Sequence, residues 1–161
     1  MGLIDFVKDA GQKLFRRGRD EEEAAQNAEK AAALNAERAV ALNNVVMGMG
    51  LEVNDFNVAV DGEVATVEGT TPSQAEREKI VLLVGNTAGI AQVDDQIAVV
   101  TPEPEAAFYT VERGDTLSGI AKKHYGKAMK YMVIFNANRP MLEDPDRIYP
   151  GQVLRIPPLD D

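Results

Sequence analysis

The amino-acid sequence predicts an α+β protein built from two small domains. Three observations support this prediction: a length of 161 residues, two separate successions of strand-like and helix-like patterns, and a proline-containing stretch between them. Residues 20–100 give the order αββαβ, which can bury one face of a sheet under two helices. Residues 108–158 give the order βααβ. Residues 101–107 contain two prolines and two glutamates, so we expect an extended linker there.

The first domain begins with a predicted helix over residues 20–49, which are rich in Ala, Glu and Leu with apolar residues at helical spacing. Glycines at positions 48 and 50 predict its end. Two runs follow, at 56–60 and 63–69, in which apolar and polar residues alternate as they do in strands. Asp61-Gly62 lies between them, and this dipeptide between alternating runs predicts a β-hairpin.

A second helix is predicted after the hairpin. Residues 71–74, Thr-Pro-Ser-Gln, have the pattern of a capping box with proline at the first helical position. The helix places Ile80, Leu83 and Val84 on one face and ends at the glycines of the segment 85–89. Residues 90–100 then predict a third strand, which completes the sheet.

The second domain is predicted to open with a short strand at 108–111, followed by a turn. Asp115 in that turn can cap a helix, whose end is predicted at Gly126. A second helix stops before the Asn-Arg-Pro sequence at 138–140, because a proline disfavours helix in the residue before it. A Pro-Gly turn and a closing strand at 153–157 complete the domain.

Residues 1–19 have an amphipathic pattern, with Leu3, Phe6 and Ala10 at helical spacing. Two interpretations remain open: a helix that docks on the first domain, or an anchor at a membrane surface. Two aspartates interrupt the short apolar face, which favours docking. The segment lacks the basic leader and the continuous apolar stretch of a signal peptide, so we expect a cytoplasmic protein.

The composition excludes several classes of function. The chain has no cysteine, which excludes a disulfide scaffold, a thiolate metal site and a cysteine nucleophile. Its single histidine excludes a metal site built from several histidines. The glycines form no phosphate-binding loop and no serine lies in a nucleophile elbow, so we expect no enzymatic activity. No apolar run approaches the length of a membrane span.

The net charge of −9 is unevenly distributed. Residues 108–161 contain eight Lys or Arg against seven Asp or Glu, whereas residues 1–107 contain nine against nineteen. An anionic surface repels nucleic acids and anionic headgroups and attracts cations, although it also serves solubility alone. We expect neither a nucleic-acid partner nor a membrane partner, and we expect a monomer.

Motifs in both domains resemble those of known families. The second domain resembles a LysM domain through Tyr109-Thr110-Val111, Gly114-Asp115-Thr116-Leu117 and the closing segment 148–157. The first domain resembles a BON domain, more loosely, through the strand at 64–69 and the segment 89–95. The succession of the two resembles a family of bacterial cytoplasmic potassium-binding proteins, which implies reversible binding of the potassium ion and ordering of the chain around it.

Potassium is a large, weakly hydrated cation, and a ring of backbone carbonyls can replace its water shell. A helix C-terminus offers free carbonyls together with the negative end of the macrodipole, and the glycine-flanked segment 85–90 follows a helix. An ordinary helix cap and loop is the alternative interpretation of this segment. The candidate carbonyl ligands are those of Val7, Ala10, Gly85, Thr87, Gly89 and Ile90.

The LysM resemblance implies a second class of ligand, glycans that contain N-acetylglucosamine, such as peptidoglycan and chitin. In that family the glycan lies in a shallow groove between the first strand–helix loop and the second helix–strand loop. Packing on the BON domain, contact with a protein partner, and association of the BON domain with a membrane surface stay open as alternatives. The matching groove positions are Gly114, Asp115, Thr116, Leu117, Asn138, Arg139, Pro140, Ile148 and Tyr149.

Overall fold

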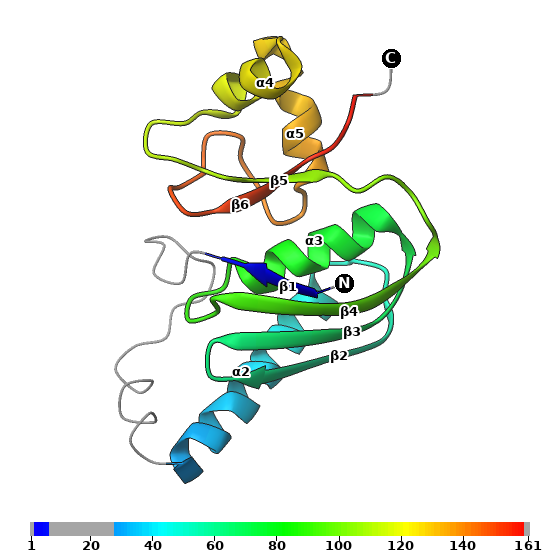
Figure 1. The fold of residues 1–161 in the computed structure, drawn as a ribbon, viewed down its shortest axis with the longest axis vertical. Coiled ribbons are helices and arrows are strands. Elements are labelled where there is room, and N and C mark those ends of the chain that lie inside the picture. Colours follow the sequence, from blue (N-terminus) through cyan, green and yellow to red (C-terminus); the bar gives the residue numbers. More distant parts are fainter. Residues whose placement is uncertain (1, 7–27, 160–161) are drawn as a thin grey trace.

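The computed structural model describes residues 2–6 and 28–159 (Figure 1). The first domain contains β1 (Gly2–Asp5), α2 (Ala28–Gly48), β2 (Asn54–Asp61), β3 (Val64–Ser73), α3 (Gln74–Gly85) and β4 (Gln92–Thr101). The second contains β5 (Ala107–Thr110), α4 (Leu117–Tyr125), the 3-10 helix η1 (Ala128–Lys130), α5 (Tyr131–Ala137) and β6 (Val153–Ile156). The predicted α+β class is confirmed. None of the helices in this part of the chain is long and apolar enough to cross a membrane.

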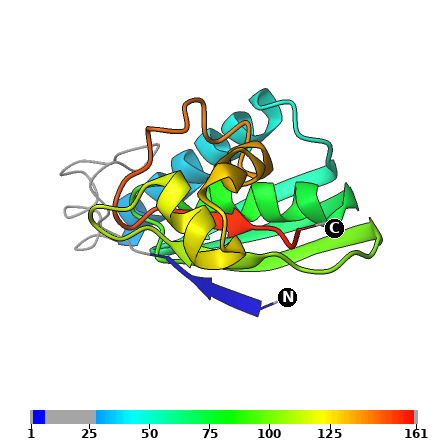
Figure 2. The same ribbon diagram turned by 90° about the horizontal axis from the view of Figure 1, so that it is seen from above.

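The first domain is built on a mixed sheet with the strand order β1-β4-β3-β2. The predicted hairpin joins β2 to β3, and β3 pairs in parallel with β4. β1 pairs antiparallel with β4, from Gly2 opposite Asp95 to Asp5 opposite Gln92, and Figure 2 shows it along one edge of the sheet. The helix predicted at the N-terminus is therefore wrong for residues 2–5, because these residues complete a sheet edge.

Helix α3 is covered on two sides. It packs with α2 against the sheet, and the second domain lies over its opposite side (Figure 1). The spacing of the sequence predicts one buried face, but the consecutive residues Ile80 to Gly85 are all buried. Val81 and Leu82 are the unexpected members, and the continuous apolar run over 80–84 is the signal for a helix covered all round.

The N-terminus of α3 lies two residues later than predicted. β3 continues in register with β4 as far as Ser73, so Thr71 and Pro72 belong to the strand. Ser73 is the N-cap, and its hydroxyl accepts a hydrogen bond from the Glu76 N–H at 3.3 Å. The predicted capping box is therefore wrong in its first residue, because pairing with β4 holds Thr71 in extended conformation.

In the second domain the antiparallel pair β5–β6 packs against α4 and α5, with its own apolar core. Thr116 caps α4 by accepting from the Gly119 N–H at 3.0 Å, in place of the predicted Asp115. Asp115 instead accepts from the Tyr109 hydroxyl at 2.6 Å and from the Glu112 N–H at 2.8 Å. The bond from Tyr109 lowers the pKa of the Asp115 carboxyl below its ordinary value.

Two asparagine side chains close the edge of β6 that does not pair with β5. Asn86, directly after α3, accepts from the Val153 N–H and donates to the Val153 carbonyl, both at 2.9 Å. Asn138, directly after α5, does the same for Arg155 at 2.8 and 2.9 Å. Each amide takes the place of one residue of a third strand. Since Asn86 belongs to the first domain, the β6 edge is completed across the domain boundary.

A buried ion pair lies beside these amides. Arg155 donates through Nε and Nη2 to one carboxylate oxygen of Glu78 in α3, at 3.0 and 2.8 Å, and both side chains are almost fully buried. The other carboxylate oxygen accepts from the Gln74 side chain and from the Ala106 N–H, both at 3.0 Å. A buried pair with its remaining oxygen satisfied is costly to break from one side. The linker and both domains are thus joined at Glu78.

Replacing Asn86 with alanine is expected to uncouple the two domains. The change leaves the buried Val153 N–H and carbonyl without partners, at a cost of about 2–4 kcal/mol. All four tyrosines lie in the second domain, so tyrosine fluorescence follows that domain, while far-UV circular dichroism follows both. During urea unfolding the two signals of the unsubstituted protein should coincide, and those of Asn86→Ala should separate.

Asn136→Ala is the matched control for this variant, because Asn136 is exposed on α5. Both of its signals should coincide, with a change in unfolding free energy within about 0.5 kcal/mol. A single coincident transition at an unchanged midpoint for Asn86→Ala would show that the amide does not couple the domains.

Candidate functional site

The loop that follows α3 is the candidate site. α3 ends at Gly85, and the N–H of its cap residue Asn86 bonds the carbonyl of Leu82 at 2.9 Å. Gly89 has φ of +87°, the left-handed conformation that glycine adopts without strain. The pair of glycines predicts this freedom for both positions, but the structure uses it only at Gly89.

Gly85 is required for space instead. A Cβ atom placed on it would lie 2.0–2.2 Å from three ring atoms of Phe6, far inside van der Waals contact. Phe6 is itself buried, and its N–H donates to the Ala91 carbonyl at 2.7 Å. The chain that leaves β1 is therefore held against both ends of the loop. The candidate ligands Val7 and Ala10 lie outside the described residues, and Val7 directly follows Phe6.

The carbonyl groups of the loop differ in how they are used. The Thr87 carbonyl accepts from the Ile90 N–H at 3.2 Å, and the Gly89 carbonyl accepts from the Arg38 side chain at 3.0 Å. Within the described residues no hydrogen bond reaches the Gly85 carbonyl. A carbonyl oxygen has two lone pairs, so one accepted hydrogen bond leaves room for a cation on the same oxygen.

Arg38 of α2 contacts the site, and it is not among the predicted site residues. It is 6% exposed, and its guanidinium donates to the Gly62 carbonyl at 2.6 Å as well as to Gly89. It thereby ties α2 to the hairpin turn and to the loop after α3. The signal is present in the spacing, because Arg38 lies four residues from both Leu34 and Leu42 and so shares their helix face.

The electrostatics of the loop combine attraction and repulsion for a cation. The last carbonyls of α3 point here, and the macrodipole gives this end about half a negative elementary charge. The Arg38 guanidinium is a positive group in the same place, and a cation on the Gly89 carbonyl would share that oxygen with it. In the described ranges no three His, Cys, Asp or Glu side chains gather into a metal-binding cluster.

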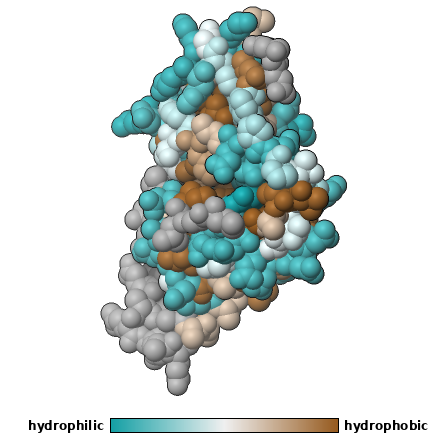
Figure 3. Space-filling view, turned by 45° about the vertical axis from the view of Figure 1, so that its right-hand side comes forward, coloured by the Kyte–Doolittle hydropathy of each residue, from teal (hydrophilic) through white to brown (hydrophobic). Residues whose placement is uncertain are grey.

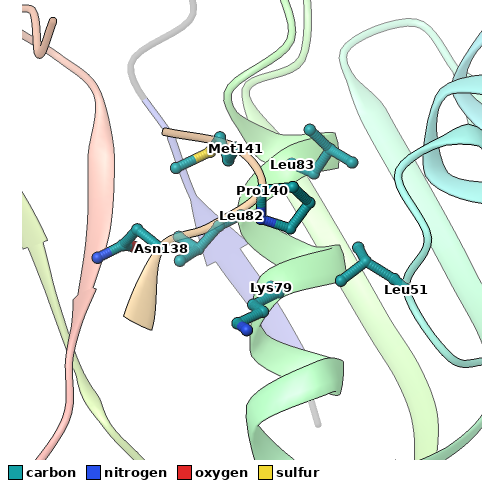
Figure 4. Close-up of a pocket in the computed structure, with 7 residues that line it drawn as sticks. All are labelled: Leu51, Lys79, Leu82, Leu83, Asn138, Pro140 and Met141. Carbon is teal, nitrogen blue, oxygen red and sulfur yellow. The ribbon is translucent and has the colours of Figure 1, made fainter. Parts of the chain in front are cut away.

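A small pocket marks where the second domain rests on α3, close to this loop. Figure 4 shows Leu82 and Leu83 of α3 facing Pro140 and Met141 of the segment that follows α5. The Asn86 amide nitrogen also lies 3.3 Å from the Met141 sulfur. The lining residues are Leu51, Lys79, Leu82, Leu83, Asn138, Pro140 and Met141. The loop after α3 and the segment after α5 are thus packed together.

The predicted glycan groove is only partly available to a ligand. Leu117 packs in the core of the second domain, Asn138 uses its amide on Arg155, and Tyr149 is 6% exposed. These three side chains stabilise the fold, so a ligand could meet mainly backbone groups at these positions, and their part in a glycan groove stays a prediction. The remaining groove positions are exposed or half-exposed: Gly114, Asp115, Thr116, Arg139, Pro140 and Ile148.

Gly85→Ala is expected to expel the Phe6 ring and to lower the free energy of unfolding by about 1–3 kcal/mol, because the methyl group and the ring overlap. Phe6→Ala has no ring for the new methyl group to overlap, so Phe6→Ala/Gly85→Ala should be no less stable than Phe6→Ala alone. Gly48→Ala is the control, because Gly48 also ends a helix and its Cβ would meet nothing within 4 Å. Urea unfolding measures all four variants, and additive costs would contradict the overlap.

Tyr149 gives a prediction about alkaline pH. Burial raises the pKa of its phenol to about 12, and within the described residues its hydroxyl has no partner. An unfolded phenol has a pKa of about 10, so stability is complete below pH 10 and is lost as the pH rises towards 12. Tyr149→Phe should remove this loss and be at least as stable as the unsubstituted protein at neutral pH.

Tyr125→Phe is the matched control, because the Tyr125 hydroxyl donates to the Pro157 carbonyl. This variant should lose about 1 kcal/mol at neutral pH. Urea unfolding at neutral and alkaline pH measures both variants. Equal losses at neutral pH would contradict the difference between the two hydroxyls.

Comparison with known proteins identifies both domains. The family model described as the LysM domain matches residues 109–157, and the BON domain model matches residues 35–101. The chain is 44% identical over 157 residues to the potassium binding protein Kbp of Escherichia coli, which covers 98% of this chain and 99% of that protein. It is 33% identical over 115 residues to an uncharacterized protein of Deinococcus radiodurans, covering 65% of this chain and 45% of that protein. The chain therefore belongs to the family of BON–LysM proteins that includes Kbp of Escherichia coli.

Proposed function

We propose that this chain binds the potassium ion reversibly, through backbone carbonyls at the end of α3. The observation that carries the proposal is the 44% identity to a potassium binding protein over nearly the whole of both chains. The packing of Phe6 on Gly85 supports it, since it holds the residue before Val7 beside the loop. The proposed ligands are the carbonyl oxygens of Val7, Ala10, Gly85, Thr87, Gly89 and Ile90.

The chemistry of these ligands suits a monovalent ion. Calcium and magnesium sites rely on carboxylate oxygens, whereas the proposed ligands are neutral carbonyls that can replace the loose water shell of potassium. The Gly85 carbonyl, which accepts no hydrogen bond within the described residues, and the negative end of the α3 macrodipole supply attraction without a formal charge. Gly89 has the left-handed backbone conformation that lets this loop turn tightly.

Binding is proposed to order the protein. An ion that holds carbonyls from the N-terminal segment and from the loop joins these two parts and stabilises the folded state by mass action, by about 2.7 kcal/mol at a hundredfold excess over Kd. Asn86 lies within the loop and holds Val153 of the LysM domain, so order in the loop extends to the domain boundary. The LysM domain is then a surface that a protein partner of the ion-bound form can recognise.

Glycan binding is the second candidate function. The match of residues 109–157 to the LysM family model favours it, and Gly114, Thr116 and Arg139 are exposed along the predicted groove. The burial of Leu117, Asn138 and Tyr149 leaves the ligand mainly backbone groups and short polar side chains there. Packing of the LysM sheet on α3 does not cover these exposed positions.

Calorimetric titration with potassium chloride, in a buffer whose only cation is organic, tests the potassium proposal. We expect saturable heat for one site with potassium, little heat with sodium chloride at the same ionic strength, and a higher thermal midpoint with potassium. Flat heats for both salts with an unchanged midpoint would contradict it. Oligomers of N-acetylglucosamine, titrated in the same way, would then test the glycan.

A pair of glycine variants places the site. Gly89→Ala should weaken potassium binding at least about tenfold, because the left-handed loop backbone is strained by a Cβ. Gly126→Ala is the control, since Gly126 has φ of +76° at the end of α4 and its Cβ would meet nothing within 4 Å. It should lose similar stability and keep its potassium affinity. Equal effects on affinity would move the site away from the loop.

A further inference from the structure

The charges of this protein are separated along its length. Between Thr116 and Leu142 there is no Asp or Glu, and this stretch carries four lysines and one arginine in a chain of net charge −9. It includes α4, η1 and α5, at the end of the molecule farthest from α2 (Figure 1). All 26 acidic residues lie outside it. One end of the LysM domain is thus basic on an otherwise acidic protein.

The junction of α4, η1 and α5, which we name the LysM tip, presents most of these charges. Lys122 and Lys123 lie in the last turn of α4, Lys127 directly precedes η1, and Lys130 is the last residue of η1. In the part of the chain that the structure describes, none of the four is in an ion pair. Lys123 donates to the Tyr109 hydroxyl at 3.1 Å, so the ammonium groups of Lys122, Lys127 and Lys130 are the ones available to an external anion. The LysM tip consists of Lys122, Lys123, Lys127, Met129, Lys130 and Met132.

Two exposed methionines lie among the lysines. Met129 is 89% exposed, more than any other large apolar side chain described, and Met132 is 41% exposed. Neither belongs to the apolar core of the LysM domain. A methionine side chain is unbranched and flexible, so it can enter an apolar phase without movement of the backbone. The aliphatic parts of the flanking lysine side chains can enter the same apolar phase while their ammonium groups stay in water.

We propose that the LysM tip binds the surface of an anionic lipid bilayer. Met129 enters the boundary between headgroups and acyl chains, and Lys122, Lys127 and Lys130 contact the lipid phosphates. Each lysine near an anionic surface strengthens binding about fivefold, and the buried methionine adds an apolar contribution. The acidic BON domain lies on the far side of the LysM domain, where salt screens its repulsion beyond about 8 Å (Figure 1).

The side chains of the tip favour lipid over other anionic partners. A nucleic acid offers phosphates but no apolar phase, and the described part of the tip has no exposed Phe, Tyr or Trp on which a base can stack. A stable protein partner needs about 800 Å² of complementary surface on each side. Figure 3 shows this end of the molecule as narrow and mostly hydrophilic, which suits shallow contact with a flat surface better than a broad interface.

Vesicle co-sedimentation of the full chain tests the proposal. Vesicles of phosphatidylcholine alone are compared with vesicles that also contain phosphatidylglycerol, at a fixed potassium concentration so that ion binding stays constant. We expect binding to the anionic vesicles at low salt, its loss at about 0.5 M salt, and no binding to the neutral vesicles. Lys122→Gln/Lys127→Gln should bind about 25-fold more weakly than the unsubstituted protein.

Two matched controls separate the tip from general charge and hydrophobicity. Arg113→Gln/Arg147→Gln removes two positive charges from exposed positions of the same domain outside the tip, and it should bind nearly as well as the unsubstituted protein. Met129→Ser should weaken binding about fivefold, whereas Met47→Ser, an exposed methionine on α2, should leave it unchanged. Circular dichroism confirms that each variant is folded.

Three outcomes would overturn the proposal. The first is the absence of binding to anionic vesicles at low salt. The second is an equal loss for the lysine pair and the arginine pair, which would indicate net charge or the arginine-rich segment 16–19 instead of the tip. The third is binding to a polynucleotide that depends on Lys122 and Lys127 but not on Met129, without binding to vesicles.

Discussion

The buried edge of β6 is the constraint around which the two domains are arranged. A strand edge removed from water needs partners for its N–H and carbonyl groups, and Asn86 and Asn138 supply them, one from each domain. Because Asn86 belongs to the BON domain, the LysM domain cannot complete its own sheet without it. The ion pair of Arg155 with Glu78 follows from the same geometry, since alternate side chains of β6 point towards α3.

Asn86 also explains why the candidate ion site and the domain boundary cannot be treated separately. Its backbone N–H caps α3, and its side chain holds Val153, while the neighbouring Gly85 receives the Phe6 ring. The end of α3, the chain after β1 and strand β6 are therefore all in contact with the two consecutive residues Gly85 and Asn86. A displacement of this loop has to be accommodated by the LysM sheet and by the chain after β1 together.

The parts of the fold set by neighbouring residues could be predicted from the sequence. The hairpin at Asp61-Gly62 and the end of α4 at Gly126 each depend on a local glycine conformation, and the structure has both. The missed features depend on distant partners: β1 pairs with β4, and Arg38 reaches Gly89, 51 residues away. Local pattern does not identify such partners. It does indicate that a partner exists where a basic residue lies on an apolar helix face, or where an apolar run is unbroken.

The pairing of β1 with β4 sets an order of events during synthesis. Gly2 lies opposite Asp95, so β1 leaves the ribosome well before β4 and has no partner in the sheet until β4 has been made. At about 5–20 residues per second, that delay is roughly 5–20 s. The hairpin β2–β3 and helices α2 and α3 can assemble within this interval, whereas β1 can join only an edge that β4 has just completed. β1, although it precedes the other strands of the BON sheet in the chain, is therefore the last of them to be added.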